Sequence, residues 1–211
     1  MDFIDLKAQQ IRIQSEISNR IHSVLKNGKY IMGPEVFELE KRLSKFVNVK
    51  HCISCSSGTD ALLMALMAWD IGPGDAVFTS PFTFIATAEV IQLLGAKPVF
   101  VDIDEKTFNI DPEKLEQEIV RIQRENQFNP KAIITVDLFG LPADYLKIES
   151  IATKHGLFLL EDAAQSFGGS IGEKMAGSFG DMAATSFFPA KPLGCYGDGG
   201  AIFTNNDLIA E

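Results

Sequence analysis

Short apolar runs alternate with longer helical segments along most of this 211-residue chain. Seven of these runs are typical of strands, because they are brief, apolar and bounded by turn residues. They cover 51–55, 75–80, 98–102, 131–137, 157–161, 182–187 and 200–204. Helical segments at 59–69, 83–94, 111–126 and 143–155 separate most of them. This alternation predicts an α/β domain with a mostly parallel sheet.

The last two predicted strands depart from that pattern. Only a proline-containing loop and a glycine-rich turn lie between 182–187 and 200–204. Parallel neighbours need a longer crossover, so this pair is expected to be antiparallel and the sheet mixed. Ahead of the first strand, 8–26 and 34–47 carry apolar residues at helical spacing. In the second of these helices, the residues expected to point inward are Val36, Phe37, Leu39, Leu43, Phe46 and Val47.

Composition and charge exclude several classes of protein. Nineteen basic against 28 acidic residues leave a net charge of −9, which disfavours binding to nucleic acid. No apolar run approaches the roughly 18 residues of a membrane span, and the acidic start is unlike a signal peptide. The chain is therefore expected to be cytoplasmic. Cys52 and Cys55 have no second pair or nearby histidine, so no metal site is expected.

The C-terminus carries a further expectation about domain organisation. Asn206 and Asp207 have the character of a helix cap, yet only four residues follow Asp207. A domain seldom stops one turn into a helix, so residues 1–211 are expected to be the first part of a longer protein.

The segment 56–60 joins the first predicted strand to an apolar helix. In α/β sheets, ligands bind at the carboxyl ends of the strands. The helix at 61–68 is apolar on every side, which predicts that it is buried. Its first N–H groups need partners. Ser57 and Thr59 can cap them, or, with Gly58, can let a phosphate approach. With one glycine present, capping is the simpler interpretation.

Asp162 and Lys191 also follow predicted strands. A buried aspartate must be hydrogen-bonded or paired, either with a structural partner or with a cation such as a protonated pyridine nitrogen. Lys191 lies between Pro189 and Pro192. Most lysines are solvated, but desolvation at a strand end would make this amine a nucleophile. The glycine-rich segment 194–200 is by itself a weak signal. Together, the helix start, the acid and the lysine are what pyridoxal phosphate (PLP) requires.

At these residues the sequence resembles the sugar-nucleotide aminotransferases of the DegT/DnrJ/EryC1/StrS family. The resemblance covers essentially the whole chain, through the segments 4–9, 28–36, 57–62, 81–87, 161–165 and 186–200. It implies an N-terminal segment plus the PLP-binding large domain of fold-type I aminotransferases. That domain is a three-layer α/β/α structure with a mixed, mostly parallel seven-stranded sheet. The family's small C-terminal domain would lie beyond Glu211.

The resemblance also implies roles for individual residues. Lys191 corresponds to the catalytic lysine that binds PLP covalently and later moves a proton, and Asp162 to the partner of the pyridine nitrogen. Gln165 is expected near the ring hydroxyl, and Phe84 on the ring, although Phe84 could equally be helix core. The phosphate contacts correspond to Gly58, Thr59 and Ser186. Phe167 stands where many relatives have histidine, so substrate detail does not carry over from those relatives.

The segment 186–201 is most similar to members that aminate C3 of a UDP-linked 3-keto-N-acetylhexosaminuronic acid. Those members use glutamate as the amino donor and serve O-antigen and lipopolysaccharide synthesis. The family expectation is a homodimer with shared active sites. The alternatives are another keto sugar nucleotide, such as a dTDP-3-keto or 4-keto-6-deoxyhexose, and a PLP-binding regulator without activity. A plain nucleotide-binding domain, in which Asp162 and Lys191 form a structural ion pair, is a further alternative.

Overall fold

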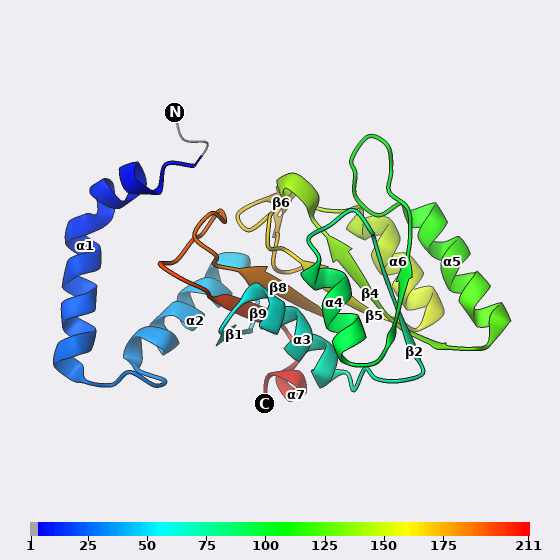
Figure 1. Cartoon of the computed structure of the whole chain (residues 1–211), viewed down its shortest axis with the longest axis horizontal. Helices are drawn as coiled ribbons and strands as arrows, with labels where there is room; N and C mark the ends of the chain where they lie inside the picture. The colour runs from blue at the N-terminus through cyan, green and yellow to red at the C-terminus, as the bar shows by residue number, and fades with distance from the viewer. Residues whose placement is uncertain (1–3) are drawn as a thin grey trace.

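The computed structural model describes residues 4–211, and one seven-stranded sheet runs through its centre (Figure 1). The strand order is β1-β9-β8-β5-β4-β2-β3. The strands are β1 (His51–Cys55), β2 (Asp75–Thr79), β3 (Lys97–Phe100), β4 (Asn129–Val136), β5 (Phe158–Asp162), β8 (Met182–Ser186) and β9 (Gly200–Thr204). All seven predicted strands are present; two have the predicted ends, and the ends of the others differ by at most two residues.

Strand direction follows the length of each connection. The five strands β3, β2, β4, β5 and β8 are mutually parallel, because helices or long crossovers join them. The short connection from β8 to β9 reverses the chain, so these two strands pair antiparallel, as predicted. Strand β1 then pairs antiparallel with β9 at the sheet edge. The sheet is therefore mixed and mostly parallel.

Helices cover both faces of the sheet and complete a three-layer α/β/α structure. Helices α3 and α4 pack on one face around Leu66, Ile91 and Ile134. Helices α5 and α6 pack on the other around Leu115, Ile133 and Ile148. The helices are α1 (Leu6–Asn27), α2 (Pro34–Val47), α3 (Gly58–Ala68), α4 (Ala86–Leu93), α5 (Pro112–Glu125), α6 (Tyr145–His155) and the short α7 (Asp207–Ala210). A hairpin of β6 (Ser170–Ile171) and β7 (Lys174–Met175) was not predicted, because two-residue strands leave no periodic signal.

Two expectations about the helices that cover the sheet need correction. Helix α4 begins at Ala86, three residues later than predicted, which leaves Thr83 and Phe84 on the preceding loop. Helix α3 is not buried on every side, since Met64 and Met67 are 41% and 57% exposed. An apolar helix exposes the side on which no other element packs. The sequence pattern does not show which side that is.

The first two helices leave most of their apolar residues exposed. In α2, Leu43 and Val47 are buried as predicted, but Phe37, Leu39 and Phe46 are exposed. Helix α1 has no buried residue and lies apart from the sheet (Figure 1). Over residues 4–211, none of the helices combines the length and apolar character needed to cross a membrane.

Candidate active site

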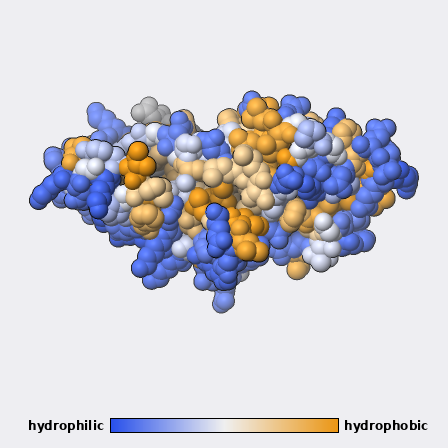
Figure 2. All heavy atoms as spheres, turned by 90° about the horizontal axis from the view of Figure 1, so that it is seen from below, coloured by the Kyte–Doolittle hydropathy of each residue, from blue (hydrophilic) through white to orange (hydrophobic). Residues whose placement is uncertain are grey.

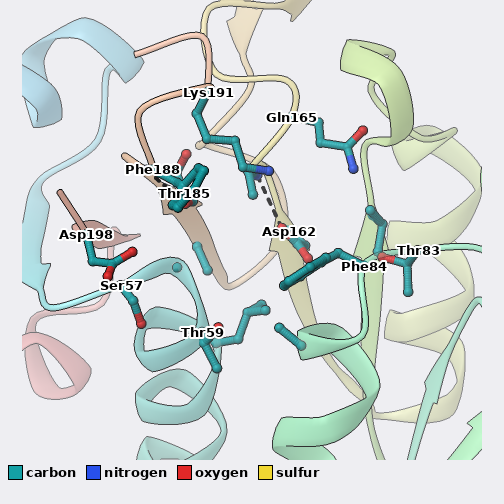
Figure 3. A pocket seen from close by; sticks show the side chains of 17 residues that line it. Ser57, Thr59, Thr83, Phe84, Asp162, Gln165, Thr185, Phe188, Lys191 and Asp198 are labelled. Carbon is teal, nitrogen blue, oxygen red and sulfur yellow. Dashed lines mark hydrogen bonds between the residues drawn. The ribbon is translucent and has the colours of Figure 1, made fainter. Parts of the chain in front are cut away.

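A pocket of about 450 Å³ lies at the carboxyl ends of β4, β5 and β8, beside the start of α3 and the loop before α4 (Figure 3). Its lining residues come from segments that are far apart in sequence. All seven residues that the sequence singled out for cofactor binding line it: Gly58, Thr59, Phe84, Asp162, Gln165, Ser186 and Lys191. Parallel strands bring their carboxyl ends to one edge, so the topology itself gathers these side chains.

The start of α3 is both capped and open. The Ser57 hydroxyl oxygen accepts a hydrogen bond from the backbone N–H of Asp60 at 3.0 Å. The N–H groups of Gly58 and Thr59 donate to no other described residue. Hydrogen bonds from Ser56 and Ser57 lower the pKa of the Asp60 carboxyl. The two sequence-based interpretations are therefore compatible, because one N–H group is capped while two can still bind an anion.

Two glycines let the strands approach the start of this helix. A Cβ on Gly58 would lie 2.6 Å from the Cβ of Ser186, and one on Gly200 would lie 2.3 Å from the carbonyl oxygen of Ser57. Carbon and oxygen atoms cannot approach so closely without displacement. Ser186 therefore lies against the helix start only because neither glycine carries a side chain.

Replacement of Gly58 by alanine is expected to separate Ser186 from α3. We expect the free energy of unfolding to fall by about 1–3 kcal/mol, the usual cost of overpacking. Urea denaturation measures this change. Gly197→Ala is the matched control, since a Cβ there meets nothing within 4 Å. Equal stability of the two variants would contradict the close approach.

Asp162 ends β5 with only 6% of its surface exposed. Its Oδ2 accepts a hydrogen bond from the Thr87 hydroxyl at 2.9 Å, and its Oδ1 accepts one from the Ala164 N–H at 3.2 Å. Burial raises the pKa of this carboxyl, although these two donors and the positive charge of Lys191 act in the opposite direction. Asp162 is thus a buried acid that is partly stabilised in its charged form.

The Lys191 side chain extends from the β8–β9 loop toward Asp162 (Figure 3). A turn in which the Lys191 N–H donates to the Phe188 carbonyl at 2.8 Å holds its backbone. The two side chains form no salt bridge, although the lysine charge lowers the pKa of the Asp162 carboxyl. This geometry does not match the alternative in which the two residues are a structural ion pair. Lys191 is half-buried. Strong desolvation of its amine stays a prediction of the sequence.

Gln165 and Phe84 occupy the rim. The Oε1 atom of Gln165 accepts a hydrogen bond from the Phe139 N–H at 2.8 Å, which leaves the amide nitrogen as a donor. Phe84 is 65% exposed and precedes α4, so it is not part of the helix core. Figure 3 shows its ring beside Asp162. The alternative interpretation of Phe84 as core is wrong.

Sequence reasoning missed several residues of this site. Thr83, Thr185, Phe188 and Asp198 also line the pocket, and Thr87 lies behind Asp162. A signal for Thr87 was available: it is a hydroxyl on the buried face of α4, beside Ala86 and Val90, where a polar group needs a partner. Elsewhere, within residues 4–211, no three or more His, Cys, Asp or Glu side chains gather in a way that could hold a metal ion.

Known proteins resemble this chain over its full length. The model of the DegT/DnrJ/EryC1/StrS aminotransferase family matches residues 11–211. A curated relative, UDP-2-acetamido-2-deoxy-3-oxo-D-glucuronate aminotransferase from Pseudomonas aeruginosa, is 55% identical over 210 residues. The match covers 100% of this chain and 56% of that relative. The chain therefore spans about half the length of the relative.

Solved structures agree with the fold. A DegT DnrJ EryC1 StrS aminotransferase from Brucella abortus superposes with a TM-score of 0.98 at 55% identity, over 100% of this chain and 56% of that one. NtdA from Bacillus subtilis, solved with bound cofactor PMP, has a TM-score of 0.85 at 32% identity and is matched over 46% of its chain. The match covers 100% of this chain. These likenesses confirm the predicted fold-type I architecture, and the chain belongs to the DegT/DnrJ/EryC1/StrS aminotransferase family.

Proposed function

We propose that this protein is a PLP-dependent aminotransferase that moves an amino group from glutamate to a nucleotide-linked keto sugar. The acceptor we propose is C3 of a UDP-linked 3-keto-N-acetylhexosaminuronic acid, in O-antigen synthesis. The observation that carries this proposal is the meeting, in one pocket, of Lys191, the buried Asp162 and the open start of α3. The 55% identity to an aminotransferase for UDP-2-acetamido-2-deoxy-3-oxo-D-glucuronate supports the choice of sugar.

The residues of the pocket fit pyridoxal phosphate. The free N–H groups of Gly58 and Thr59, together with Ser186, would hold the phosphate. The buried Asp162 carboxylate would pair with the protonated ring nitrogen, which supplies the cation that this acid lacks. The Gln165 amide nitrogen would donate to the ring hydroxyl, and Phe84 would pack on the ring.

When bound, PLP supplies a ring that withdraws electrons from the reacting carbon and an aldehyde group that holds the nitrogen between donor and acceptor. The Lys191 Nζ would bind the cofactor's aldehyde carbon until the donor displaces it. The freed amine would then move the proton to and from the reacting carbon, as a general acid and base. Asp162 would keep the ring nitrogen protonated throughout. Glutamate leaves as 2-oxoglutarate, and the sugar carbonyl becomes an amine.

Substrate screening tests this proposal directly. The protein, PLP and glutamate are mixed with a UDP-linked 3-keto-N-acetylhexosaminuronic acid, and 2-oxoglutarate is measured. We expect at least about tenfold higher kcat/KM for this sugar than for dTDP-3-keto or 4-keto-6-deoxyhexoses, since loss of one or more polar contacts costs about 1.4 kcal/mol or more. Preference for a dTDP sugar would reassign the substrate. PLP binding without amino transfer to any keto sugar would favour the regulator.

We further propose that the protein is a homodimer with shared active sites. Phe37 and Leu39 of α2 are 56% and 40% exposed, and α1 buries none of its apolar residues. Hydrophobic residues also gather at the middle of the face shown in Figure 2, while hydrophilic residues cover its ends. Exposed apolar surface of this kind is typical of subunit interfaces.

Replacement of Phe37 by aspartate is expected to weaken this dimer. Loss of one buried phenylalanine costs about 1.5–3 kcal/mol, which corresponds to at least about a tenfold higher dissociation constant. Sedimentation equilibrium measures the constant. Leu146→Asp is the control, because Leu146 is 86% exposed on α6, on another part of the molecule. A Phe37→Asp protein that dimerises like the control would place the interface elsewhere.

A further inference from the structure

A line of hydroxyl groups leads from the pocket wall to Asp162. The Thr83 Oγ1 lies 3.1 Å from the Thr87 Oγ1, which in turn donates to the Asp162 Oδ2 at 2.9 Å. Thr83 lines the pocket and is half-buried, whereas Thr87 is fully buried. The hydrogen bond from Thr87 is the one side-chain hydrogen bond that Asp162 receives from the described residues.

The direction of these hydrogen bonds depends on the charge of Asp162. An ionised carboxylate only accepts, so the single proton of Thr87 must point toward it. Thr87 can then only accept from Thr83, and the line runs from Thr83 through Thr87 to Asp162. A protonated Asp162 would instead donate, and the line would reverse. Thr87 therefore favours the charged form as long as Thr83 orients its hydroxyl.

We propose that Thr87 is a positioning residue that holds the Asp162 carboxylate charged and in place, with Thr83 orienting the Thr87 hydroxyl. This inference rests on the proposed function, because a charged carboxylate is needed there to face a cationic ring nitrogen. Burial opposes that charge, and the Ala164 N–H and the nearby Lys191 are the other groups that favour it. Thr87 belongs to α4 and does not line the pocket. It acts on the site through its hydrogen bond to Asp162.

A structural role alone would not require the hydroxyl. Thr87 lies on the buried face of α4 with Ala86, Val90 and Ile91, where valine would have the same branched shape. Thr87→Val therefore removes the donor with little change in volume. Thr87→Ser keeps the donor and removes only a methyl group. The pair separates the hydrogen bond from packing.

The first readout is the pKa of the Asp162 carboxyl in the cofactor-free protein. Carbon-13 NMR of labelled aspartate, assigned with Asp162→Asn, measures it. A hydrogen bond to a charged group is worth about 1.5–3 kcal/mol, so we expect Thr87→Val to raise this pKa by about 1 to 2. Thr87→Ser is expected to stay close to the unmodified protein. Thr83→Val, which leaves Thr87 in place, should produce a smaller rise.

The second readout is the dissociation constant of pyridoxal phosphate, measured by absorbance at a fixed pH near 8. We expect at least about tenfold weaker binding for Thr87→Val and rescue by Thr87→Ser. The inference would be overturned if Thr87→Val changed neither the pKa of the Asp162 carboxyl nor the affinity for pyridoxal phosphate. If Thr87→Val does not fold, an unchanged Asp162 pKa in Thr83→Val would overturn it instead. An unmodified protein that binds no pyridoxal phosphate would instead overturn the proposed function and this inference with it.

Discussion

Replacement of Lys191 by alanine is expected to reduce amino transfer at least about a thousandfold. The variant loses both the nucleophile and the general acid/base, and loss of acid/base catalysis alone costs about 10² to 10⁴ in rate. The pocket keeps the start of α3, Asp162 and Gln165, so pyridoxal phosphate should still bind. Formation of 2-oxoglutarate from glutamate measures the rate. Borohydride reduction followed by peptide mapping should label Lys191 in the unmodified protein only.

Two variants make this result specific. Lys191→Arg keeps the positive charge near Asp162 but cannot act as the nucleophile, so it should be as inactive as Lys191→Ala. Lys147→Ala is the matched control, because Lys147 is an exposed residue of α6 whose one salt bridge among residues 4–211 is with Asp144. It should retain full activity. Normal turnover by Lys191→Ala would end the proposed mechanism, and a label on another lysine would move the site.

Asp137→Asn is expected to change how the stability of the protein depends on pH. Asp137 and Glu161 are both fully buried on the face of the sheet opposite Asp162. The Asp137 oxygens accept hydrogen bonds from the Ala143 N–H and from the Tyr145 and Ser166 hydroxyls, at 2.8–3.0 Å. The Glu161 oxygens accept from two backbone N–H groups, at 2.7 and 2.8 Å.

The two carboxyls are close enough for each to affect the ionisation of the other, and we expect one of them to hold a proton in the folded protein. Neither forms a salt bridge with a described residue, and the other titratable group that faces them is Tyr145. Burial raises the pKa of both, and the charge of Asp137 raises that of Glu161 further. Two buried negative charges side by side would be costly, because no cation compensates them.

The sign of the pH effect follows from proton counts. Above the usual carboxyl pKa of about 4, the unfolded chain has released both protons while the folded pair keeps one. The free energy of unfolding therefore falls as the pH rises, until it passes the raised pKa of the pair. One retained proton gives a slope of about 1.4 kcal/mol per pH unit. The raised pKa of Asp162 contributes in the same direction in both proteins.

Asp137→Asn replaces one of the two acids by a neutral amide that carries its own donors. Its Oδ1 can accept from Ala143 and Tyr145, while its two N–H groups can donate to Glu161 and Ser166. Glu161 can then ionise without a negative neighbour. Urea denaturation from pH 5 to pH 9 should show the variant losing less stability as the pH rises. Parallel curves for the two proteins would show that the pair holds no proton in the folded state.

The sequence by itself determined the architecture to a large extent. Apolar runs such as 131–137 and 157–161 predicted the strands, because strands covered on both faces must be apolar throughout. The short connection after 182–187 predicted the antiparallel pair, because a hairpin leaves no room for a crossover. Asp162, Lys191 and the start of α3 could be named from their places near strand ends and a helix start, whereas the roles of Phe84, Gln165 and Ser186 came from the resemblance to the family.

Only the tertiary structure decided which side chains meet. In the sequence, Thr87 only occupies a position on the apolar face of a helix. The fold places it beside the end of β5, where its hydroxyl donates to Asp162, 75 residues later in the chain. Asp137 and Glu161 affect each other's ionisation only because β4, which ends one residue before Asp137, lies beside β5. Phe37 and Phe46 have the spacing of core residues, yet each is more than half exposed in the described structure. Periodicity records which face of an element is apolar, whereas burial and pairing depend on the element that lies opposite, and that partner is set by long-range packing.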